Sequence, residues 1–406
     1  MNADIGKIRI FPKYENSRLI CGTQVELLLH VLAFSCRVMK LLFRTKENVD
    51  SFLESSYLIV KSGGNAMYWR FLKMLLISDV VSFIRGNERH LSLTIPRQIA
   101  EKEKGKVFSI YAKMLFSLLK TGCTFKEYYN LGFYKRSLKN QKTFITTGSN
   151  LIAYGIMNDA SCNHVYINKD EFNTVYADFM AREWIKLSED RQLVYDFFQR
   201  HKSVIVKPRT GDSGKGIFVI HDPSSLQLKD IDNIIAENKD GIVEEVLHNH
   251  SDLNILNDSS LNTLRIITIR RGEKLDILFA GIRYGAKGSE VDNISQGGYV
   301  APIDIESGCI CGQSYQKKTV TESLAEEQNY QGFQIPLWDK MPEYLMKLTS
   351  VVPQMRYMAW DIAITDNGFA TIEGNHSSGN TIIQAHLGIG QEGLKNRLDT
   401  LMQDAL

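Results

Sequence analysis

The sequence predicts an α+β protein with mostly antiparallel sheets, preceded by a mainly helical amino-terminal domain. Residues 20 to about 140 carry apolar side chains at helical spacing, whereas later segments form pairs of apolar strands joined by short turns. A few helices are interspersed among these hairpins, which is typical of α+β architecture. We therefore divide the chain into a helical domain over residues 1–140 and an α+β domain over residues 141–406.

Size and composition set outer limits on function. At 406 residues the chain is long enough for two or three domains, and 44% apolar with 23% charged residues is ordinary for a soluble protein. A net charge of +2 indicates no general attraction to DNA or RNA. The six cysteines are scattered, and the single Cys309-Ile-Cys311 cluster lacks a second pair, so thiols in a reducing compartment are favoured over a metal centre.

The amino-terminal segment predicts a cytoplasmic location. The first twenty residues are rich in charge and have no apolar core, so no signal peptide is expected. Residues 25–43 are about as long as a membrane span, but Glu26, His30, Arg37 and Lys40 interrupt them, which favours a buried or amphipathic helix. Its basic end could touch an anionic membrane, although a solvated helix end is the favoured interpretation.

The expected elements follow in chain order. In the helical domain we expect helices over 25–43, 68–77, 108–120 and 124–131. In the second domain Asp170 is expected to cap a helix whose apolar positions extend to Phe179. The strands that follow are expected over 203–208, 217–221, 241–247, 261–270 and 275–283, with helices over 342–351 and 394–406.

The most informative segment is the hairpin over residues 357–375, with its turn at Asp366-Asn367-Gly368. If those three residues form the loop, Thr365 pairs with Phe369 and Asp361 lies opposite Glu373. A two-residue loop would put Asp361 on the other face of the sheet, because side chains alternate along a strand.

Glu373 and Asn375 are two residues apart and share one face of a strand. Together with Asp361 they would place two carboxylates and an amide at one point, a donor set that suits Mg²⁺ when substrate phosphates complete the site. Edge carboxylates that face water are the alternative interpretation. An unpaired carboxylate is costly to bury, so these residues need a cation or the solvent.

The Gly-rich loop Thr210-Gly-Asp-Ser-Gly-Lys-Gly216 joins two predicted strands. Its glycines permit positive φ, and successive backbone N–H groups can cradle phosphate oxygens. It is not a Walker loop, because the spacing differs and a strand follows where a helix would be required. A flexible hairpin tip is the alternative interpretation.

Nearby lysines offer phosphate contacts. Lys207 follows three apolar strand residues and is awkward to bury without an anion, although an edge lysine that blocks aggregation is the alternative. Lys169 precedes the capped helix and, considered alone, is best explained as a solvated turn residue. Residues 243–247 could pair with an adenine edge and a ribose, with a plain strand end as the default.

The order of these parts resembles the ATP-grasp superfamily. It is most similar to the branch associated with sugar transfer and surface-polysaccharide loci, with a likeness to the alpha-L-glutamate ligases. Those relatives share the strand lysine, the mobile Gly-rich loop, two arginines, an Asn followed by Gly-Gly and a Glu-x-Asn pair. The resemblance covers about residues 141–406. It implies two α+β subdomains gripping ATP, a nucleotide-binding lid over about 165–247 and a metal and catalytic subdomain over 248–406.

The resemblance also implies roles for particular residues. The residues expected to bind ATP are Lys169, Lys207, Gly211, Ser213, Gly214, Lys215, Gly216, Glu244, Glu245, Val246 and Leu247. Asp361, Glu373 and Asn375 would hold two Mg²⁺ ions, with Mn²⁺ as an alternative. Arg265 and Arg283 would steady an acyl phosphate, and Asn293 would line the site near the γ-phosphate.

The implied reaction is the ATP-dependent joining of a carboxylate to an amine through an acyl phosphate. The expected substrates are an amino acid and a sugar acid or similar acceptor of surface-polysaccharide biosynthesis. A phosphotransferase with a hydroxyl acceptor and a non-catalytic nucleotide-binding module are the alternatives. The sequence departs from the relatives' pattern at Asn262-Thr263 and at His376-Ser-Ser-Gly379, and its helical domain is unlike their usual amino-terminal domain. That helical domain could shape the acceptor pocket, dock a glycosyltransferase or mediate dimerisation.

Overall fold

The computed structural model describes residues 91–211, 216–289, 292, 297–316, 329–376, 379–380 and 382–403. The helices expected over 25–43 and 68–77 lie outside the described residues, as do Ser213, Gly214, Lys215 and Asn293. The chain separates into two units after Lys61, and all that follows concerns the unit Ser62–Leu406.

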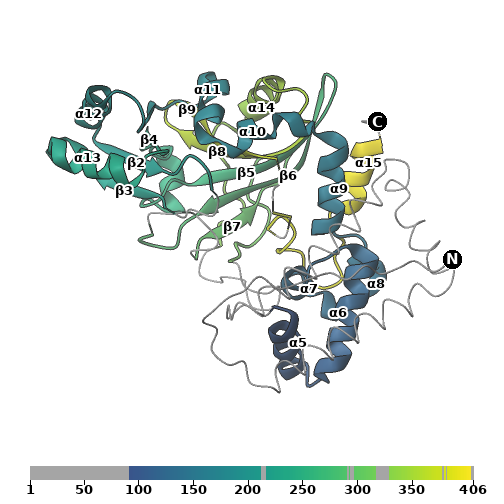
Figure 1. Ribbon diagram of the computed structural model, residues 1–406. Coiled ribbons are helices and arrows are strands. Elements are labelled where there is room, and N and C mark those ends of the chain that lie inside the picture. The colour runs from purple at the N-terminus through teal and green to yellow at the C-terminus, as the bar shows by residue number, and fades with distance from the viewer. Residues whose placement is uncertain are drawn as a thin grey trace, which may run out of the picture. The chain divides into compact units, whose positions relative to one another are not determined.

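Helices come first in the described chain, as expected (Figure 1). The predictions over 108–120 and 124–131 are confirmed by α6 (Val107–Thr121) and α7 (Phe125–Asn130). Around them lie α5 (Leu91–Lys102), η1 (Phe133–Lys135), α8 (Leu138–Gln141) and α9 (Thr147–Met157). A capping box between Thr124 and Glu127 begins α7, and Gly122, with φ of 69°, ends α6.

The short helices before the first sheet are η2 (Ala160–Cys162), α10 (Asn163–Ile167), α11 (Lys169–Val175) and η3 (Ala177–Phe179). The expected cap at Asp170 is wrong, because the residue before α11 is Asn168. Asp170 lies in the first turn instead, where a carboxylate favours the helix dipole, and it pairs with Arg209 at 2.7 Å and Lys186 at 3.2 Å.

The smaller sheet has the strand order β1-β4-β2-β3, all antiparallel. Its strands are β1 (Trp184–Lys186), β2 (Ser203–Lys207), β3 (Phe218–His221) and β4 (Ile242–Glu245). The helices α12 (Arg191–Arg200) and α13 (Leu228–Glu237) cover the face of Val204 and Val206, and η4 (Pro223–Ser225) precedes α13. Because side chains alternate, Ile205, Lys207 and Glu244 share the opposite face.

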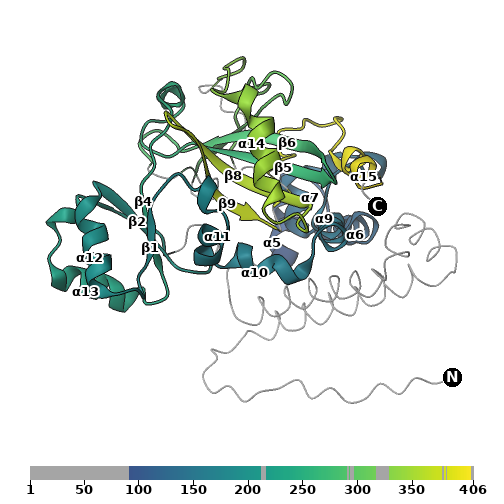
Figure 2. The same ribbon diagram turned by 90° about the horizontal axis from the view of Figure 1, so that it is seen from above.

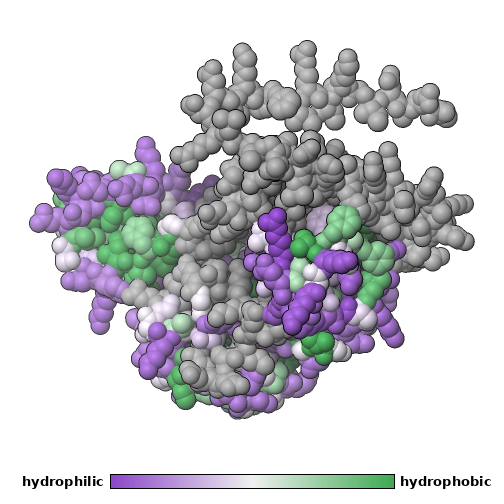
Figure 3. All heavy atoms as spheres, turned by 90° about the horizontal axis from the view of Figure 1, so that it is seen from below, coloured by the Kyte–Doolittle hydropathy of each residue, from purple (hydrophilic) through white to green (hydrophobic). Residues whose placement is uncertain are grey.

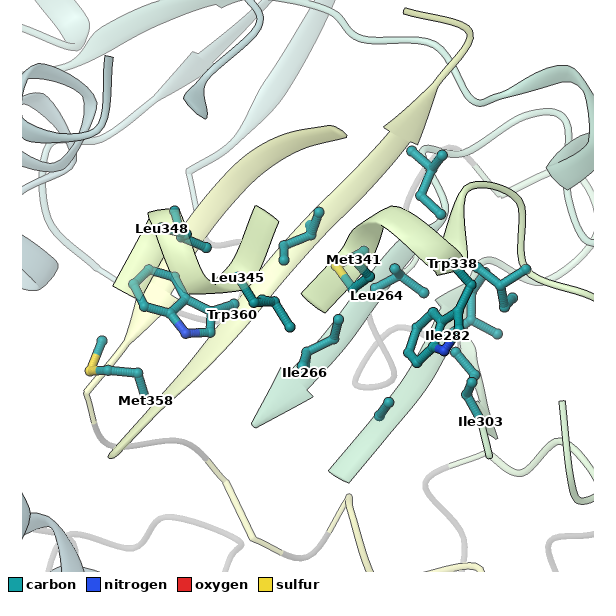
Figure 4. Close-up of a cluster of buried hydrophobic side chains, with 14 of the residues drawn as sticks. Leu264, Ile266, Ile282, Ile303, Trp338, Met341, Leu345, Leu348, Met358 and Trp360 are labelled. Carbon is teal, nitrogen blue, oxygen red and sulfur yellow. The ribbon is translucent and has the colours of Figure 1, made fainter. Parts of the chain in front are cut away.

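The larger sheet has the strand order β7-β6-β5-β8-β9, also antiparallel. After η5 (Ser251–Ile255) come β5 (Thr263–Arg271), β6 (Lys274–Tyr284), β7 (Tyr299–Pro302), β8 (Tyr357–Thr365) and β9 (Gly368–Asn375). One face packs under η7 (Trp338–Lys340) and α14 (Met341–Ser350), which lies across the sheet (Figure 2). Leu345 and Leu348 of α14 meet Leu264, Ile266 and Trp360 there (Figure 4).

The opposite face of the larger sheet is divided in two. One half is apolar, where Ile267, Ile269 and Tyr357 pack with residues of α9 and α15 (Lys395–Gln403). The other half carries the charged side chains of Arg265, Asp361 and their neighbours. The fold therefore covers one end of this face and leaves its polar end for a site.

The β8–β9 hairpin corrects one prediction and confirms another. Its loop has two residues, since Thr365 pairs with Gly368, so the three-residue loop is wrong. A β-bulge then shifts the register beside Ile362, and Asp361 still lies opposite Glu373. The extra residue on the bulged strand restores the pairing that the shorter loop would have lost.

These observations confirm the α+β class and the helical region that precedes it. In the described part of the chain, no helix is long and apolar enough to cross a membrane.

Candidate active site

Asp361 lies at the centre of the polar half of the larger sheet and is 1% exposed. Its Oδ2 accepts hydrogen bonds from Nη2 of Arg283 at 2.9 Å and Nη2 of Arg265 at 3.2 Å. Nε of Arg265 lies 2.8 Å from Oδ1, but neither of those two atoms makes an aligned hydrogen bond. The carboxylate is therefore neutralised by two guanidinium groups while one of its buried oxygens lacks a well-placed donor.

Strand register sets the order of charge across the sheet. Arg265 of β5 pairs with Asp361 of β8, which pairs with Glu373 of β9. Directly opposed residues on neighbouring strands have adjacent side chains, so these three form one row. The partly exposed Glu373 accepts a hydrogen bond from Nδ2 of Asn375 at 3.1 Å. The structure thus brings together Asp361, Glu373, Asn375, Arg265 and Arg283, as predicted.

The two carboxylates are coupled. Burial raises the pKa of Asp361 to about 7, although Arg265 and Arg283 lower it. Burial also raises the pKa of Glu373, but the hydrogen bond with Asp361 and the charge of Arg265 outweigh it and lower that pKa to about 2. The two carboxylates therefore titrate as a pair, in which Asp361 binds a proton more readily than Glu373 as the pH falls.

Two residues that the sequence reasoning did not place support Arg283. The hydroxyl of Thr263 accepts hydrogen bonds from Nε of Arg283 at 3.0 Å and from its Nη2 at 2.8 Å, and it donates to Asp292. Asp292 Oδ2 also lies 3.6 Å from Nη2 of Arg283. Burial lowers the pKa of Arg283, but Asp361, Asp292 and Glu373 raise it above its usual range.

The residues around Asp361 fit a hard divalent cation in part. Two carboxylates, an amide and the poorly satisfied Oδ1 of Asp361 are donors of the kind that Mg²⁺ takes. Over the described ranges no group of three or more His, Cys, Asp or Glu residues could hold a metal by itself. A metal ion at this site would therefore need further oxygen atoms from a ligand. The charge of Asp361 is already partly neutralised by Arg265 and Arg283.

On the smaller sheet Lys207 has an anionic partner from the protein. Its ammonium lies 2.5 Å from Oε2 of Glu244, and Nε of Arg182 lies 2.8 Å from the same oxygen. Nδ2 of Asn173 donates to Oε1 at 2.8 Å. Burial raises the pKa of Glu244, but Arg182 and Lys207 outweigh it and hold that pKa well below its usual range.

Lys169 lies beside the start of the Gly-rich loop. Its ammonium donates to the carbonyl of Gly211 at 3.0 Å, and its backbone N–H donates to the carbonyl of Arg209 at 2.9 Å. The described ends of the loop, Gly211 and Gly216, have φ of 118° and 72°, which disfavour other residues. The lysine and the loop that sequence reasoning assigned to phosphate are thus neighbours.

The segment Glu244–Leu247 begins in β4 and continues as an irregular connector. Glu244 is buried in its ion pairs, whereas Glu245, Val246 and Leu247 are partly exposed. Ile205 and Val219 pair across β2 and β3 on the face that carries Lys207. Hydrophobic side chains gather over this sheet in the view from below (Figure 3). A flat apolar surface beside a cationic group suits a base and its phosphates.

Sequence reasoning missed Arg182, Asn173, Thr263 and Asp292. Arg182 and Asn173 stand among ordinary helical and turn residues, so no local pattern identifies them. Asp292 precedes Asn293, a residue that was predicted, and Thr263 occupies a position at which the pattern called for an acidic residue. Asp292 supplies a carboxylate there from a different segment.

The fold has two antiparallel sheets. One carries a lysine beside a Gly-rich loop, and the other carries a row of arginine and carboxylates. This arrangement is typical of an ATP-grasp protein. Residues 171–403 match the model of the sugar-transfer associated ATP-grasp family. The chain belongs to that family. No curated protein matches it.

Solved structures with a similar fold are distant. The ATP-grasp ligase PsnB, complexed with a minimal precursor variant, Mg and ADP, shares 13% identity, with 64% of this chain and 67% of that chain covered and a TM-score of 0.37. The D-alanyl-alanine synthetase A of Vibrio cholerae shares 12%, with 61% and 68% covered and a TM-score of 0.37. The D-alanine–D-alanine ligase of Helicobacter pylori shares 14%, with 62% and 64% covered and a TM-score of 0.39. At this distance the similarities carry no argument about activity.

Proposed function

We propose that this protein is an ATP-dependent carboxylate–amine ligase that works through an acyl phosphate and releases ADP. The observation that carries the proposal is the row Arg265–Asp361–Glu373, with Arg283 on the same carboxylate. Alternating positive and negative groups on one sheet face suit a triphosphate that is approached by a second anion. Membership of the ATP-grasp family supports the nucleotide.

The smaller sheet would hold the nucleotide. Lys207 and Lys169 would bind its phosphates, and residues 211–216 would close over them. Adenine would lie on the apolar face near Ile205, with Glu245, Val246 and Leu247 at its edge. Glu244 is better explained as the counter-ion of Lys207 than as a ribose ligand, because three side chains already bind its carboxylate.

The larger sheet would hold the metal and the reacting groups. Asp361, Glu373 and Asn375 would be the protein ligands, and Asp361 would share its charge with Arg265 and Arg283. When bound, Mg²⁺ would neutralise part of the charge of the phosphates. We propose two such ions, with Mn²⁺ as an alternative.

The protein's own groups would then supply charge and position. The substrate carboxylate attacks the γ-phosphorus, the bond to ADP breaks, and an acyl phosphate forms. The amine attacks the acyl carbon, phosphate leaves, and the amine loses a proton. Arg265 and Arg283 would stabilise the negative charge in both steps, and a closed Gly-rich loop would exclude water from the acyl phosphate.

The family's association with sugar transfer supports a substrate from that chemistry. We propose that an amino acid is joined to a sugar acid or similar acceptor during surface-polysaccharide biosynthesis in the cytoplasm, where ATP is supplied.

A phosphate-release screen tests this proposal. The full chain with Mg²⁺ and ATP is incubated with amino acids against uronic-acid and amino-sugar acceptors. The ligase account predicts one ADP and one free phosphate per product, and only when both substrates are present. Phosphate retained on a hydroxyl acceptor would show a kinase. No ATP turnover with any pair would favour a nucleotide-binding module.

A further inference from the structure

Arg182, in the segment between η3 and β1, joins the two sheets. Its side chain is 2% exposed and donates four hydrogen bonds to protein acceptors. Nε binds Oε2 of Glu244 at 2.8 Å, and Nη1 donates to the carbonyls of Met180 at 3.1 Å and Thr371 at 2.9 Å. Nη2 donates to the carbonyl of Ile372 at 3.3 Å. One guanidinium thus contacts the carboxylate that binds Lys207 and the backbone of β9.

The β9 carbonyls that Arg182 binds belong to the bulge. Thr371 pairs with Ile362 while Glu373 pairs with Asp361, so Ile372 is the extra residue. A bulge locally disrupts the ladder and needs other partners for its backbone. The hydroxyl of Thr371 meets that of Tyr344 on α14 at 2.7 Å, so the bulge is held from two sides. This bulge is what places Glu373 opposite Asp361.

At its other end Arg182 shares Oε2 of Glu244 with Lys207. A lysine that turns toward a phosphate gives up part of its pairing with this carboxylate, whose side chain is 2% exposed. A buried carboxylate without a cationic partner is strongly disfavoured. Arg182 keeps Glu244 paired in either position of Lys207, because its fork has separate donors for Glu244 and for the bulge.

We propose that Arg182 is a positioning residue that couples the nucleotide-binding sheet to the metal-binding hairpin. It keeps Glu244 neutralised so that Lys207 can bind phosphate, and it holds the bulge that aligns Glu373 with Asp361. The expected effect of Arg182 on nucleotide binding rests on the proposed function. The contacts between Arg182 and the bulge are present without any ligand.

The first test needs no nucleotide. Amide hydrogen exchange over residues 368–375 is measured in the full chain for Arg182→Met, Arg182→Lys and the control Arg200→Met. Arg200 is an exposed arginine paired with Glu183, so its loss leaves the bulge intact. We expect exchange at the bulge to rise about tenfold in both Arg182 variants and to stay unchanged in the control. Unchanged exchange in Arg182→Lys would overturn the role at the bulge, even if Arg182→Met failed to fold.

The second test measures ADP affinity with and without Mg²⁺. In Arg182→Met, Lys207 is the only cation left beside Glu244, so metal-free ADP affinity should fall about tenfold. Arg182→Lys should stay within about threefold of wild type. Adding Glu244→Gln to Arg182→Met should restore the metal-free ADP affinity, because Lys207 no longer faces a buried carboxylate. The extra ADP affinity that Mg²⁺ provides should remain low in this double variant, because the bulge still lacks Arg182. Failure to restore it would overturn the counter-ion role.

The two tests separate this inference from the proposed function. If the wild-type protein did not bind ADP, the proposed function would fail, and the exchange measurement would still decide whether Arg182 holds the bulge.

Discussion

At the scale of single residues, Lys207 shows what a sequence can and cannot predict. A lysine after three apolar strand residues needs an anion, and the structure supplies one in Glu244. The sequence could indicate the need for a partner but not its identity, because the two residues lie on different strands. A phosphate bound by Lys207 would therefore compete with Glu244, because the ammonium already has this partner.

Lys207→Ala should weaken ADP binding by more than about tenfold, the scale of one lost charge-assisted hydrogen bond. Titration calorimetry on the full chain measures it. Lys202→Ala is the matched control, since Lys202 is exposed just before the same strand. Equal ADP affinity in Lys207→Ala and wild type would remove Lys207 from the site.

Acid should weaken the ion pairs of Glu244. Its folded pKa lies well below the usual 4.5, so below about pH 4.5 the unfolded chain binds a proton that the folded chain does not. Stability from this group is present above pH 4.5 and is lost as the pH falls toward the folded pKa.

Compared with Glu244→Gln, the wild-type protein should be more stable by roughly 3–5 kcal/mol at pH 7. That advantage should shrink by about 1.4 kcal/mol per pH unit below pH 4.5. Urea unfolding of both proteins at pH 7, 4.5 and 3.5 measures it. An advantage that is constant over this range would contradict the pairing.

At the scale of elements, the hairpin over 357–375 was predictable in its strands and in the pairing of Asp361 with Glu373. Its loop length was not, because the Asp366-Asn367-Gly368 turn suits two or three residues. The bulge that reconciles the shorter loop with the pairing is contacted by Arg182 and Tyr344, which are remote in sequence.

Other elements were predictable according to the strength of their pattern. The long strands β6 and β8 are nearly continuous apolar runs, β5 has an apolar centre, and all three were found. The three-residue β1 is too short to show alternation, and β7 ends at Pro302, a residue that argues against a strand, so both were missed. The helices α12 and α13 were not predicted either. Many polar residues on their exposed faces obscure the helical spacing of their apolar residues.

Gly374, between Glu373 and Asn375, should be sensitive to any side chain. An added Cβ would lie 2.9 Å from Trp360 and 3.0 Å from Tyr166, both in packed ring clusters. Gly374→Ala should therefore cost about 1–3 kcal/mol of stability and shift both metal-ligand candidates. Thermal unfolding and ADP binding with Mg²⁺ measure the two effects.

Gly379→Ala is the control for that substitution, because no atom of the described residues lies within 4 Å of its added Cβ. Equal unfolding temperature and equal Mg²⁺-dependent affinity in the two variants would mean that the packing behind β9 does not position Glu373.

At the scale of the molecule, contacts cross the predicted boundary between residues 140 and 141. Glu127 of α7 accepts from Asn380 Nδ2 at 2.7 Å, and Nη2 of Arg136 donates to the carbonyl of Leu387 at 2.6 Å. The helices before residue 140 therefore hold the segment that follows the candidate metal site. The boundary remains a prediction, and sequence patterns could not show these contacts because more than 250 residues separate each pair.

Glu127→Ala should destabilise the described helices and the larger sheet together. The substitution leaves Asn380 and the backbone N–H groups of Thr124 and Thr147 without this acceptor, which should cost about 2–4 kcal/mol. Circular dichroism and tryptophan fluorescence should report one shared, lowered unfolding midpoint.

Glu103→Ala serves as the control, since Glu103 is 37% exposed in its pair with Lys135. Two separate transitions, with only the helical signal lowered in Glu127→Ala, would show that the helices and the sheets unfold independently.

Metal-dependent nucleotide binding is the decisive measurement for the site around Asp361 and Glu373. Titration of the full chain with ADP, with and without Mg²⁺, compares the wild-type protein with Glu373→Gln, which is preferred to Asp361→Asn because it leaves no buried arginine unpaired. The account predicts that Mg²⁺ tightens ADP binding at least about tenfold in the wild-type protein and has little effect in Glu373→Gln. The same Mg²⁺ effect in both proteins, or no ADP binding in either, would contradict the account.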